Sequence, residues 1–373
     1  MTDLISNCSK LGFGMMRLPR LEDGNTIDVE QTKEMVDRFI KAGGKYFDTA
    51  FIYDGSEEAT GKALCSRYSR DSYYLATKLN ASAFCCKSRE EALKEIEISL
   101  QRTGAEYFDF YLLHALDHTN MGRYEEFGLW DFVKELKERG LIRHYGFSFH
   151  DTADVLEEII IKHPDAEFVQ LQINYNDWED EGIQSRKIAE VANKHGLPII
   201  VMEPVKGGLL ATPPQQVRDI FSKIDPDASP ASWAIRFAAS VEGVMVVLSG
   251  MSNMEQMNDN MSYMEDFKPL NAIEKSAIEE VIDVLSKLKG IPCTGCSYCT
   301  AGCPMEIAIP DIFTIMNMYR INNDLPKAIS EYQDRMMEAP ASSCLECGQC
   351  ESACPQHLSI TELLKEAAAT LEK

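Results

Sequence analysis

The sequence is poor in basic residues and has no long apolar run. It contains 37 lysines and arginines against 59 aspartates and glutamates, for a net charge of −22 at pH 7. Nucleic-acid binding requires clustered Lys and Arg, so this balance argues against a nucleic-acid partner. No apolar run approaches the length of a membrane span, and residues 1–5 lack the basic and apolar blocks of a secretory signal. We therefore expect a cytoplasmic protein without membrane insertion.

Cysteine, in contrast, is plentiful and ordered. Eight of the twelve cysteines form two copies of the spacing C-x2-C-x2-C-x3-C-P. The copies are Cys293, Cys296, Cys299 and Cys303, and then Cys344, Cys347, Cys350 and Cys354. This run is typical of [4Fe–4S] cluster ligation. Zinc usually takes its ligands in two separated pairs, so a repeated group of three plus one fits zinc poorly. The sequence predicts two [4Fe–4S] clusters.

The fourth cysteine of each run is expected to ligate the cluster of the other run, as is usual in two-cluster proteins. Cys303 would then complete the second site, and Cys354 would complete the first. Cluster thiolates must be loaded in the reduced state, which favours the cytoplasm and an anaerobic setting. The other four cysteines show no ligand spacing: Cys8, Cys65, Cys85 and Cys86.

Before these runs, β-rich segments alternate with segments of helical period. The predicted strands are Leu11–Met15, Tyr46–Thr49, Tyr73–Thr77, Phe108–Leu113, His144–Phe147, Phe168–Ile173, Ile199–Met202 and Val244–Leu248. The helical segments include Val29–Ala42, Arg89–Arg102, Phe132–Arg139, Ile183–His195 and Pro230–Ala239. Eight βα units in about 250 residues are typical of an α/β (β/α)8 TIM barrel. An open doubly wound sheet is the alternative, but no G-x-G-x-x-G follows the first strand.

Polar residues stand at or just after the ends of the predicted strands, where a barrel of this kind places its chemistry. They are Asp48, Lys78, His114, Ser148, Gln172, Asn174, Glu203 and Ser249. Any one of them could serve a loop, but the regular position along successive strands indicates a shared site.

The chain after residue 290 reads as a second domain. Gly290 and Pro292 break the preceding helical segment, and forty residues separate the two cysteine runs. Helical patterns cover 311–319, 326–337 and 360–371. This length exceeds a compact βαββαβ ferredoxin, so we expect a small, mainly α-helical ferredoxin-like domain over 290–373, after a barrel over 1–289.

Residues 46–53 read Y-F-D-T-A-F-I-Y, residues 76–78 A-T-K, residues 111–114 Y-L-L-H and residues 145–148 Y-G-F-S. In this order the four motifs resemble the aldo-keto reductase family, and the resemblance runs from about residue 10 to 265. Residues 46–53 are similar to the family's D-T-A-x-x-Y signature. Residues 76–78, A-T-K, resemble its catalytic-lysine strand, and residues 111–114, Y-L-L-H, its catalytic-histidine strand. Residues 145–148, Y-G-F-S, resemble the strand that contacts the cofactor amide.

This resemblance implies a catalytic tetrad of Asp48, Tyr53, Lys78 and His114. Tyr53 would donate a proton to a carbonyl oxygen, and a neighbouring Lys78 ammonium would stabilise the phenolate. Asp48 would keep the lysine charged, and His114 would orient or polarise the carbonyl.

The resemblance also implies a nicotinamide nucleotide, NAD(P)H. Ser148 and Gln172 would bind its carboxamide, and the segment after the eighth strand would bind the adenosine phosphate. That segment contributes Ser249, Gly250, Gln256 and Asn260. It has no lysine at 248–253, and Gln256 stands where the family often has an arginine, so the preference between NADH and NADPH stays open. Gly207, after the seventh strand, is expected to let the backbone approach a cofactor.

The two halves handle electrons differently, since NAD(P)H carries two as hydride and a cluster carries one. The first hypothesis is an oxidoreductase that interconverts a carbonyl and an alcohol, while the clusters carry electrons to or from the site or a partner such as a ferredoxin or another redox protein. A flavin-linked reductase on the same barrel is an alternative. An electron-transfer or redox-sensing protein with a vestigial barrel is another.

Overall fold

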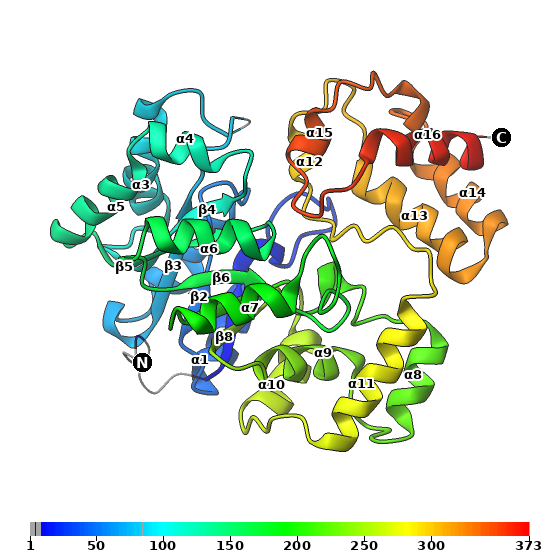
Figure 1. The fold of residues 1–373 in the computed structure, drawn as a ribbon, viewed down its shortest axis with the longest axis horizontal. Helices are drawn as coiled ribbons and strands as arrows, with labels where there is room; N and C mark the ends of the chain where they lie inside the picture. Colours follow the sequence, from blue (N-terminus) through cyan, green and yellow to red (C-terminus); the bar gives the residue numbers. More distant parts are fainter. Residues whose placement is uncertain (1–3, 5–8, 84, 373) are drawn as a thin grey trace. The chain divides into compact units, whose positions relative to one another are not determined.

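Eight parallel strands close into a barrel in which each strand pairs with the next and β8 pairs with β1 (Figure 1). The strands are β1 (Leu11–Gly14), β2 (Tyr46–Asp48), β3 (Tyr74–Leu79), β4 (Phe108–Leu116), β5 (Ile142–Phe149), β6 (Val169–Gln172), β7 (Ile199–Met202) and β8 (Val244–Ser249). This computed structural model describes residues 4, 9–83 and 85–372, so Cys8 lies outside the described residues. The predicted TIM barrel is confirmed, and β7 has the predicted bounds.

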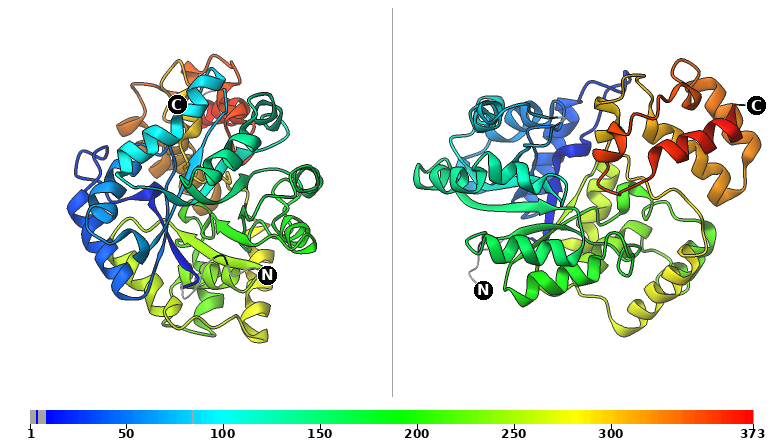
Figure 2. Two further views of the ribbon diagram at one scale, coloured as in Figure 1. Left: turned by 90° about the vertical axis from the view of Figure 1, so that its left-hand side faces the viewer. Right: turned by 45° about the horizontal axis from the view of Figure 1, so that its top comes forward.

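Helices lie on the outside of the strands, as the left view of Figure 2 shows. They are α1 (Val29–Lys41), α2 (Ser56–Thr60), α3 (Arg89–Thr103), α4 (Met121–Glu126), α5 (Leu129–Glu138), α6 (Ala153–Lys162), α7 (Ser185–Lys194), α9 (Pro230–Ala239) and α10 (Met254–Met264). Local signals set their ends. In α3, the Ser88 side chain accepts a hydrogen bond from the Glu91 N–H, and Gly104 ends the helix at a φ of 66°.

The interior of the barrel is apolar below the ends of the strands. Its buried residues are Tyr46, Ala76, Phe110, Leu112, Phe168, Ile200, Val246 and Leu248. Side chains along a strand alternate between faces, so the residue two positions further along also points inward. That step leads from Tyr46 to Asp48, from Ala76 to Lys78 and from Leu112 to His114. The polar site therefore continues the inward face of the same strands that fill the core.

By its internal contacts the chain divides into two units. The barrel unit comprises Met1–Pro204 and Ala231–Leu270, and the C-terminal unit comprises Val205–Pro230 and Asn271–Lys373. The segment that follows β7 thus belongs to the C-terminal unit, together with α8 (Gln215–Ser222).

The C-terminal unit is mainly α-helical, as predicted. Besides α8 it contains α11 (Ala272–Leu285), α12 (Tyr298–Ala301), α13 (Ile309–Asn322), α14 (Leu325–Arg335), α15 (Gln349–Ser352) and α16 (Ile360–Leu371). Its core includes Ile312, Phe313, Tyr332 and Leu364, and two of the predicted cluster ligands, Cys299 and Cys350, belong to the same core. The cysteine runs are therefore part of the packed interior of this unit rather than a loose extension.

The two cysteine runs repeat one backbone course at an offset of 51 residues, which is the separation of Cys293 and Cys344. A short helix begins five residues after the first cysteine of each run, and a longer helix begins sixteen residues after it. Left-handed residues also coincide, with φ values of 64° at Ser297 and 73° at Gly348. The same structural unit therefore occurs twice.

Among the described residues, no helix is both long and apolar enough to cross a bilayer.

Gly207 makes a close backbone approach inside the C-terminal unit. Its φ is 63°, and a Cβ atom there would lie 2.1 Å from the Thr294 carbonyl oxygen. Thr294 stands between Cys293 and Gly295 in the first cysteine run. The segment after β7 thus packs directly on the backbone of that run.

We expect Gly207→Ala to destabilise the C-terminal unit by about 2 kcal/mol more than a glycine-to-alanine change that meets open space, because alanine would collide with backbone. Gly348→Ala is the matched control, with a φ of 73° and no atom within 4 Å of the added Cβ. Urea-induced loss of the visible cluster absorbance measures the difference. Equal urea midpoints for the two variants would show that the close approach carries no energetic weight.

Candidate active site and cluster sites

A buried lysine forms the centre of the barrel site. Lys78 is fully buried, and its Nζ donates to Asp48 Oδ1 at 2.5 Å and to the Thr49 carbonyl at 2.7 Å. The Tyr53 hydroxyl lies 3.4 Å from the same nitrogen. Three acceptors around one nitrogen suit the three donors of an ammonium group.

Burial and pairing act in opposite directions on the charges of this site. Burial lowers the pKa of Lys78, while the charge of Asp48, the hydrogen bond to it and the charge of Glu57 raise it. Burial likewise raises the pKa of Asp48, while Lys78 and the Gln170 amide lower it. Each ion offsets the cost of burying the other, so each of the two side chains stays charged only while its partner is also charged.

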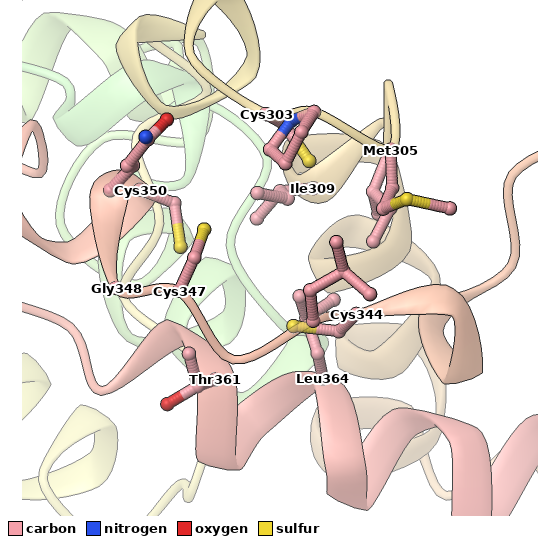
Figure 3. A pocket seen from close by; sticks show the side chains of 13 residues that line it. Cys303, Met305, Ile309, Cys344, Cys347, Gly348, Cys350, Thr361 and Leu364 are labelled. Atoms are coloured by element: carbon pink, nitrogen blue, oxygen red, sulfur yellow. The ribbon is translucent and has the colours of Figure 1, made fainter.

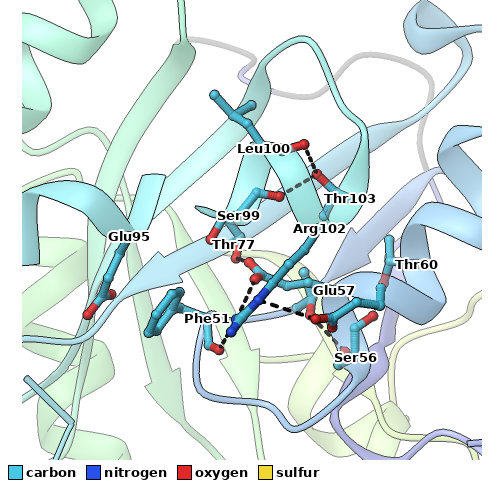
Figure 4. Close-up of polar contacts among 12 residues, drawn as sticks. Phe51, Ser56, Glu57, Thr60, Thr77, Glu95, Ser99, Leu100, Arg102 and Thr103 are labelled. Atoms are coloured by element: carbon cyan, nitrogen blue, oxygen red, sulfur yellow. Dashed lines mark hydrogen bonds and ion pairs between the residues drawn. The ribbon is translucent and has the colours of Figure 1, made fainter. Parts of the chain in front are cut away.

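Tyr53 is supplied by the loop between β2 and α2, and this loop is anchored by residues around it (Figure 4). Arg102 on α3 donates to the Phe51 carbonyl at 2.9 Å and pairs with Glu57 at 3.2 Å. Glu57 in turn accepts from the Thr77 hydroxyl at 2.7 Å. Thr77 precedes Lys78 in β3, so these contacts connect the tyrosine loop to the lysine strand.

His114 completes the predicted tetrad from β4. Its ring stands edge-on to that of Tyr53, with the ring centroids 5.8 Å apart. Burial, with the nearby charge of Lys78, lowers the pKa of His114 well below its usual value. The imidazole is therefore neutral at physiological pH and suits hydrogen bonding to a substrate oxygen better than carrying charge.

Gln170 belongs to this site but was not among the predicted residues. Its amide nitrogen donates to Asp48 Oδ2 at 3.1 Å, on the side of the carboxylate opposite Lys78. The sequence signal was available, because Gln170 lies two residues after the inward-facing Phe168 and two before Gln172.

The residues predicted to bind a nicotinamide lie at the C-terminal ends of their strands and have protein partners. The Ser148 hydroxyl accepts from the Ala115 N–H at 2.7 Å. The Gln172 amide donates to Asp177 Oδ2 at 2.8 Å. These bonds fix both side chains in place, and their contact with a nucleotide stays a prediction.

Side-chain hydrogen bonds connect the residues of the segment after β8, 249–260, that is predicted to bind the adenosine phosphate. Asn260 donates to the Ser249 hydroxyl at 2.7 Å, and the Gln256 side chain accepts from the Ser252 N–H at 2.7 Å. Beside it, the aliphatic stem of Arg17 would lie 3.4 Å from a Cβ atom added to Gly250. Arg17 therefore lies beside a segment whose own sequence has no cation, while its guanidinium stands 3.8 Å from Glu203. Sequence reasoning missed this neighbour because the two are distant in the chain.

Gly207 is the predicted cofactor residue that lies in the C-terminal unit. The backbone approach it permits is to Thr294. A nucleotide contact at Gly207 stays a prediction.

Three cysteines of the second run and one of the first line a single pocket (Figure 3). Its cysteines are Cys303, Cys344, Cys347 and Cys350, and their sulfur atoms surround the central space. Cys303 belongs to the first run, so the pocket brings one cysteine of that run beside three of the second, and ligation of a cluster by these four stays a prediction. Three thiolates plus one from the opposite run are the donor set of a [4Fe–4S] cluster.

Cysteines of both runs lie around Cys299 of the first run. Burial raises the pKa of the Cys299 thiol, and the neighbouring thiols of Cys296, Cys293, Cys354 and Cys350 add to this effect. Cys354 thus lies near the first run. Each run also contains a hydrogen bond of 3.4 Å from a backbone N–H to the sulfur of its first cysteine. Gly295 donates to Cys293, and Glu346 donates to Cys344.

A buried carboxyl group lies behind the tetrad, at the end of β3. Glu95 on α3 accepts a hydrogen bond from the Asn80 N–H at 2.8 Å, and the Cys85 sulfur lies 3.9 Å from its other oxygen. Burial raises the pKa of Glu95 to about 8, so the group is largely protonated at neutral pH.

Comparison with known proteins assigns the barrel and the cysteine-rich C-terminal segment to known families. The sequence matches the aldo/keto reductase family over residues 10–283 and a 4Fe-4S dicluster domain over residues 292–358. The chain belongs to the aldo/keto reductase family and carries a 4Fe-4S dicluster domain. It is an iron-sulfur oxidoreductase, which confirms the predicted enzyme class.

Relatives with a known name support the assignment to the aldo/keto reductase family. An aldo-keto reductase of Mycolicibacterium paratuberculosis is 30% identical over 236 residues, which are 62% of this chain and 75% of that protein. A D-galacturonate reductase of Fragaria ananassa is 24% identical over 69% of this chain and 82% of its own length. An aldo-keto reductase of Strobilurus tenacellus is 29% identical over 54% of this chain, and the match spans 60% of that relative.

Solved structures share the barrel. An aldo-keto reductase from Bacillus halodurans in its holo form has a TM-score of 0.58 and 24% identity, over 74% of this chain and 92% of its own. An aldo/keto reductase from Klebsiella pneumoniae, solved in complex with NADP and acetate, has a TM-score of 0.57 and 20% identity over 74% of this chain and 92% of its own. Likeness at this identity shows the fold.

Double variants test the exchange of fourth ligands. We expect the double variant Cys303→Ala/Cys347→Ala to halve bound iron, because both cysteines would ligate the same cluster. The double variant Cys303→Ala/Cys296→Ala should remove nearly all iron, because each cluster would lose one ligand. Iron and acid-labile sulfide assays on anaerobic protein measure this, with Cys65→Ala as a full-iron control. The reverse order of the two double variants would contradict the exchange.

Glu95 should make the barrel less stable as pH rises. The folded state keeps the Glu95 proton up to about pH 8, whereas the unfolded state loses it near the ordinary glutamate pKa of 4.5. Stability from this group is therefore full below pH 4.5 and falls by roughly 1 kcal/mol per pH unit toward pH 8. Urea unfolding at pH 5.5 and 7.5 should show a shallower pH dependence for Glu95→Gln, and an unchanged dependence would refute this assignment.

Proposed function

We propose that the barrel interconverts a carbonyl compound and the corresponding alcohol, with Tyr53 as proton donor assisted by Lys78, Asp48 and His114. The observation that carries this proposal is the position of the Lys78 nitrogen, which lies 2.5 Å from Asp48 and 3.4 Å from the Tyr53 hydroxyl. A buried ammonium in that position stabilises negative charge on the tyrosine oxygen.

Reduction of a carbonyl needs a proton at oxygen as well as a hydride at carbon. Tyr53 can deliver that proton, because the charge left on its oxygen faces Lys78. The Lys78 nitrogen also lies 4.7 Å from the centre of the Tyr53 ring, which limits the ring's freedom to turn away. His114 can donate or accept a hydrogen bond at the same carbonyl oxygen, because burial keeps its imidazole neutral.

NAD(P)H is the proposed reductant of the barrel, and when bound it supplies the hydride. Ser148 and Gln172 would hold its carboxamide, and Ser249, Gly250, Gln256 and Asn260 would lie along its adenosine phosphate. Support comes from their positions at the C-terminal ends of β5, β6 and β8 and at α10. Arg17 would supply the phosphate segment with a cation.

Two [4Fe–4S] clusters are the proposed electron carriers, one held by Cys344, Cys347, Cys350 and Cys303 and the other by Cys293, Cys296, Cys299 and Cys354. The pocket among the first four supports this assignment. When bound, each cluster passes single electrons. We further propose a partner such as a ferredoxin or another redox protein, a small-molecule substrate, a cytoplasmic location and a functional division at residue 290.

A flavin-linked reductase on the same barrel is the second candidate, because a flavin would convert hydride into single electrons. A visible spectrum of the anaerobic protein distinguishes it by flavin peaks beside the cluster absorbance. A vestigial barrel is the least favoured reading, since the buried Asp48–Lys78 pair costs desolvation that a purely structural core would not need.

We expect Tyr53→Phe to lower kcat for NAD(P)H-dependent carbonyl reduction by at least about 100-fold, because a general acid contributes that order of rate. Bound iron should stay at the wild-type value, since Tyr53 lies in the barrel unit. Steady-state NADPH oxidation with a panel of aldehydes and ketones gives the rate.

Tyr68→Phe is the matched control, because its hydroxyl bonds to Asp37 away from the tetrad. It should retain wild-type turnover. Wild-type turnover in Tyr53→Phe would remove the proton-donor assignment.

A further inference from the structure

The two cysteine runs share one backbone course but differ in their exposure to solvent. Thr294, after the first cysteine of the first run, is 3% exposed, while the equivalent Leu345 is 63% exposed. The next two positions follow the same trend. Gly295 and Cys296 are half-buried, whereas Glu346 and Cys347 are exposed.

The cover of the first run comes from the segment after β7, because Gly207 packs on the Thr294 backbone. At the equivalent place in the second run, the chain presents a leucine side chain to solvent. Leu345 therefore places an apolar side chain at the surface beside Cys347, a predicted cluster ligand.

Leu345 has an apolar neighbour. Met305, 37% exposed, lines the same pocket as Leu345 and Cys347. The charged groups nearby are mainly acidic: Glu306 follows Met305, and Glu346 follows Leu345. Lys365 pairs with both Glu346 at 2.8 Å and Glu362 at 3.1 Å. Acidic groups remain in excess.

We propose that Leu345, Met305 and the exposed Cys347 form the docking surface for a one-electron carrier protein whose contact face is basic. This inference rests on the proposed function, because it needs the second cluster to be present. A small apolar centre with a charged rim is a common form of a transient interface. The acidic rim attracts a basic partner and repels an acidic one.

Each encounter transfers one electron. When electrons leave the protein, the reduced second cluster loses one electron and the oxidised carrier gains it, with no proton transferred and no bond made or broken. The inward direction reverses each step, with a reduced carrier as the donor.

Stopped-flow oxidation of the reduced holoenzyme by ferric cytochrome c, a basic one-electron protein, tests the surface. Anaerobic protein is reduced with dithionite, freed of excess reductant and mixed at low and high salt. We expect Glu346→Lys to lower the second-order rate constant about tenfold at low salt, with little difference at high salt. Leu345→Ser should lower it about threefold at both salt concentrations, because it removes apolar contact.

The matched controls are Glu280→Lys and Ile273→Ser on α11, which are also exposed. They should react like the wild type, and all variants should keep full iron. Rates in the Leu345 and Glu346 variants that equal those of the controls would overturn the docking surface. That result is distinct from failure of the proposed function, which would appear as missing iron or as undiminished carbonyl turnover in Tyr53→Phe.

Discussion

The buried ammonium of Lys78 is the interaction on which the barrel site depends. No water reaches it, so its charge must be balanced by the groups around it, and Asp48 is the counter-ion. Removing one partner of such a pair costs about 3–5 kcal/mol, because the other charge is left buried alone. Asp48 is held in turn by Gln170, and the tyrosine loop is fixed by Arg102. A single buried charge thereby links three strands and a loop into one arrangement.

Much of this arrangement could be predicted from the chain because it follows short-range rules. Inward-facing residues recur every second position of a strand, so Asp48, Lys78 and His114 each follow an apolar core residue. The eight strands and the cysteine spacing are equally local signals. Strand ends were less certain. Both β4 and β5 extend beyond the predicted bounds, because pairing with a neighbour rather than composition decides where a strand stops.

What escaped prediction depends on contacts between distant parts of the chain. Arg17 lies beside Gly250 although more than 200 residues separate them, and neither local sequence indicates this. Gly207 was expected beside a cofactor because two glycines follow a strand, yet the neighbour that requires its bare backbone is Thr294. A glycine indicates that another group approaches the backbone closely, but the sequence does not identify that group.

The passage of the chain after β7 has a consequence for how this protein can be taken apart. Residues 205–230 leave the barrel, join the C-terminal unit and return for α9. No single cut between the units therefore yields two intact pieces, and a chain shortened at residue 289 would leave this excursion without the Thr294 backbone on which it rests. The two units are interleaved along the sequence, so expression of either one needs a chain that carries both parts of it.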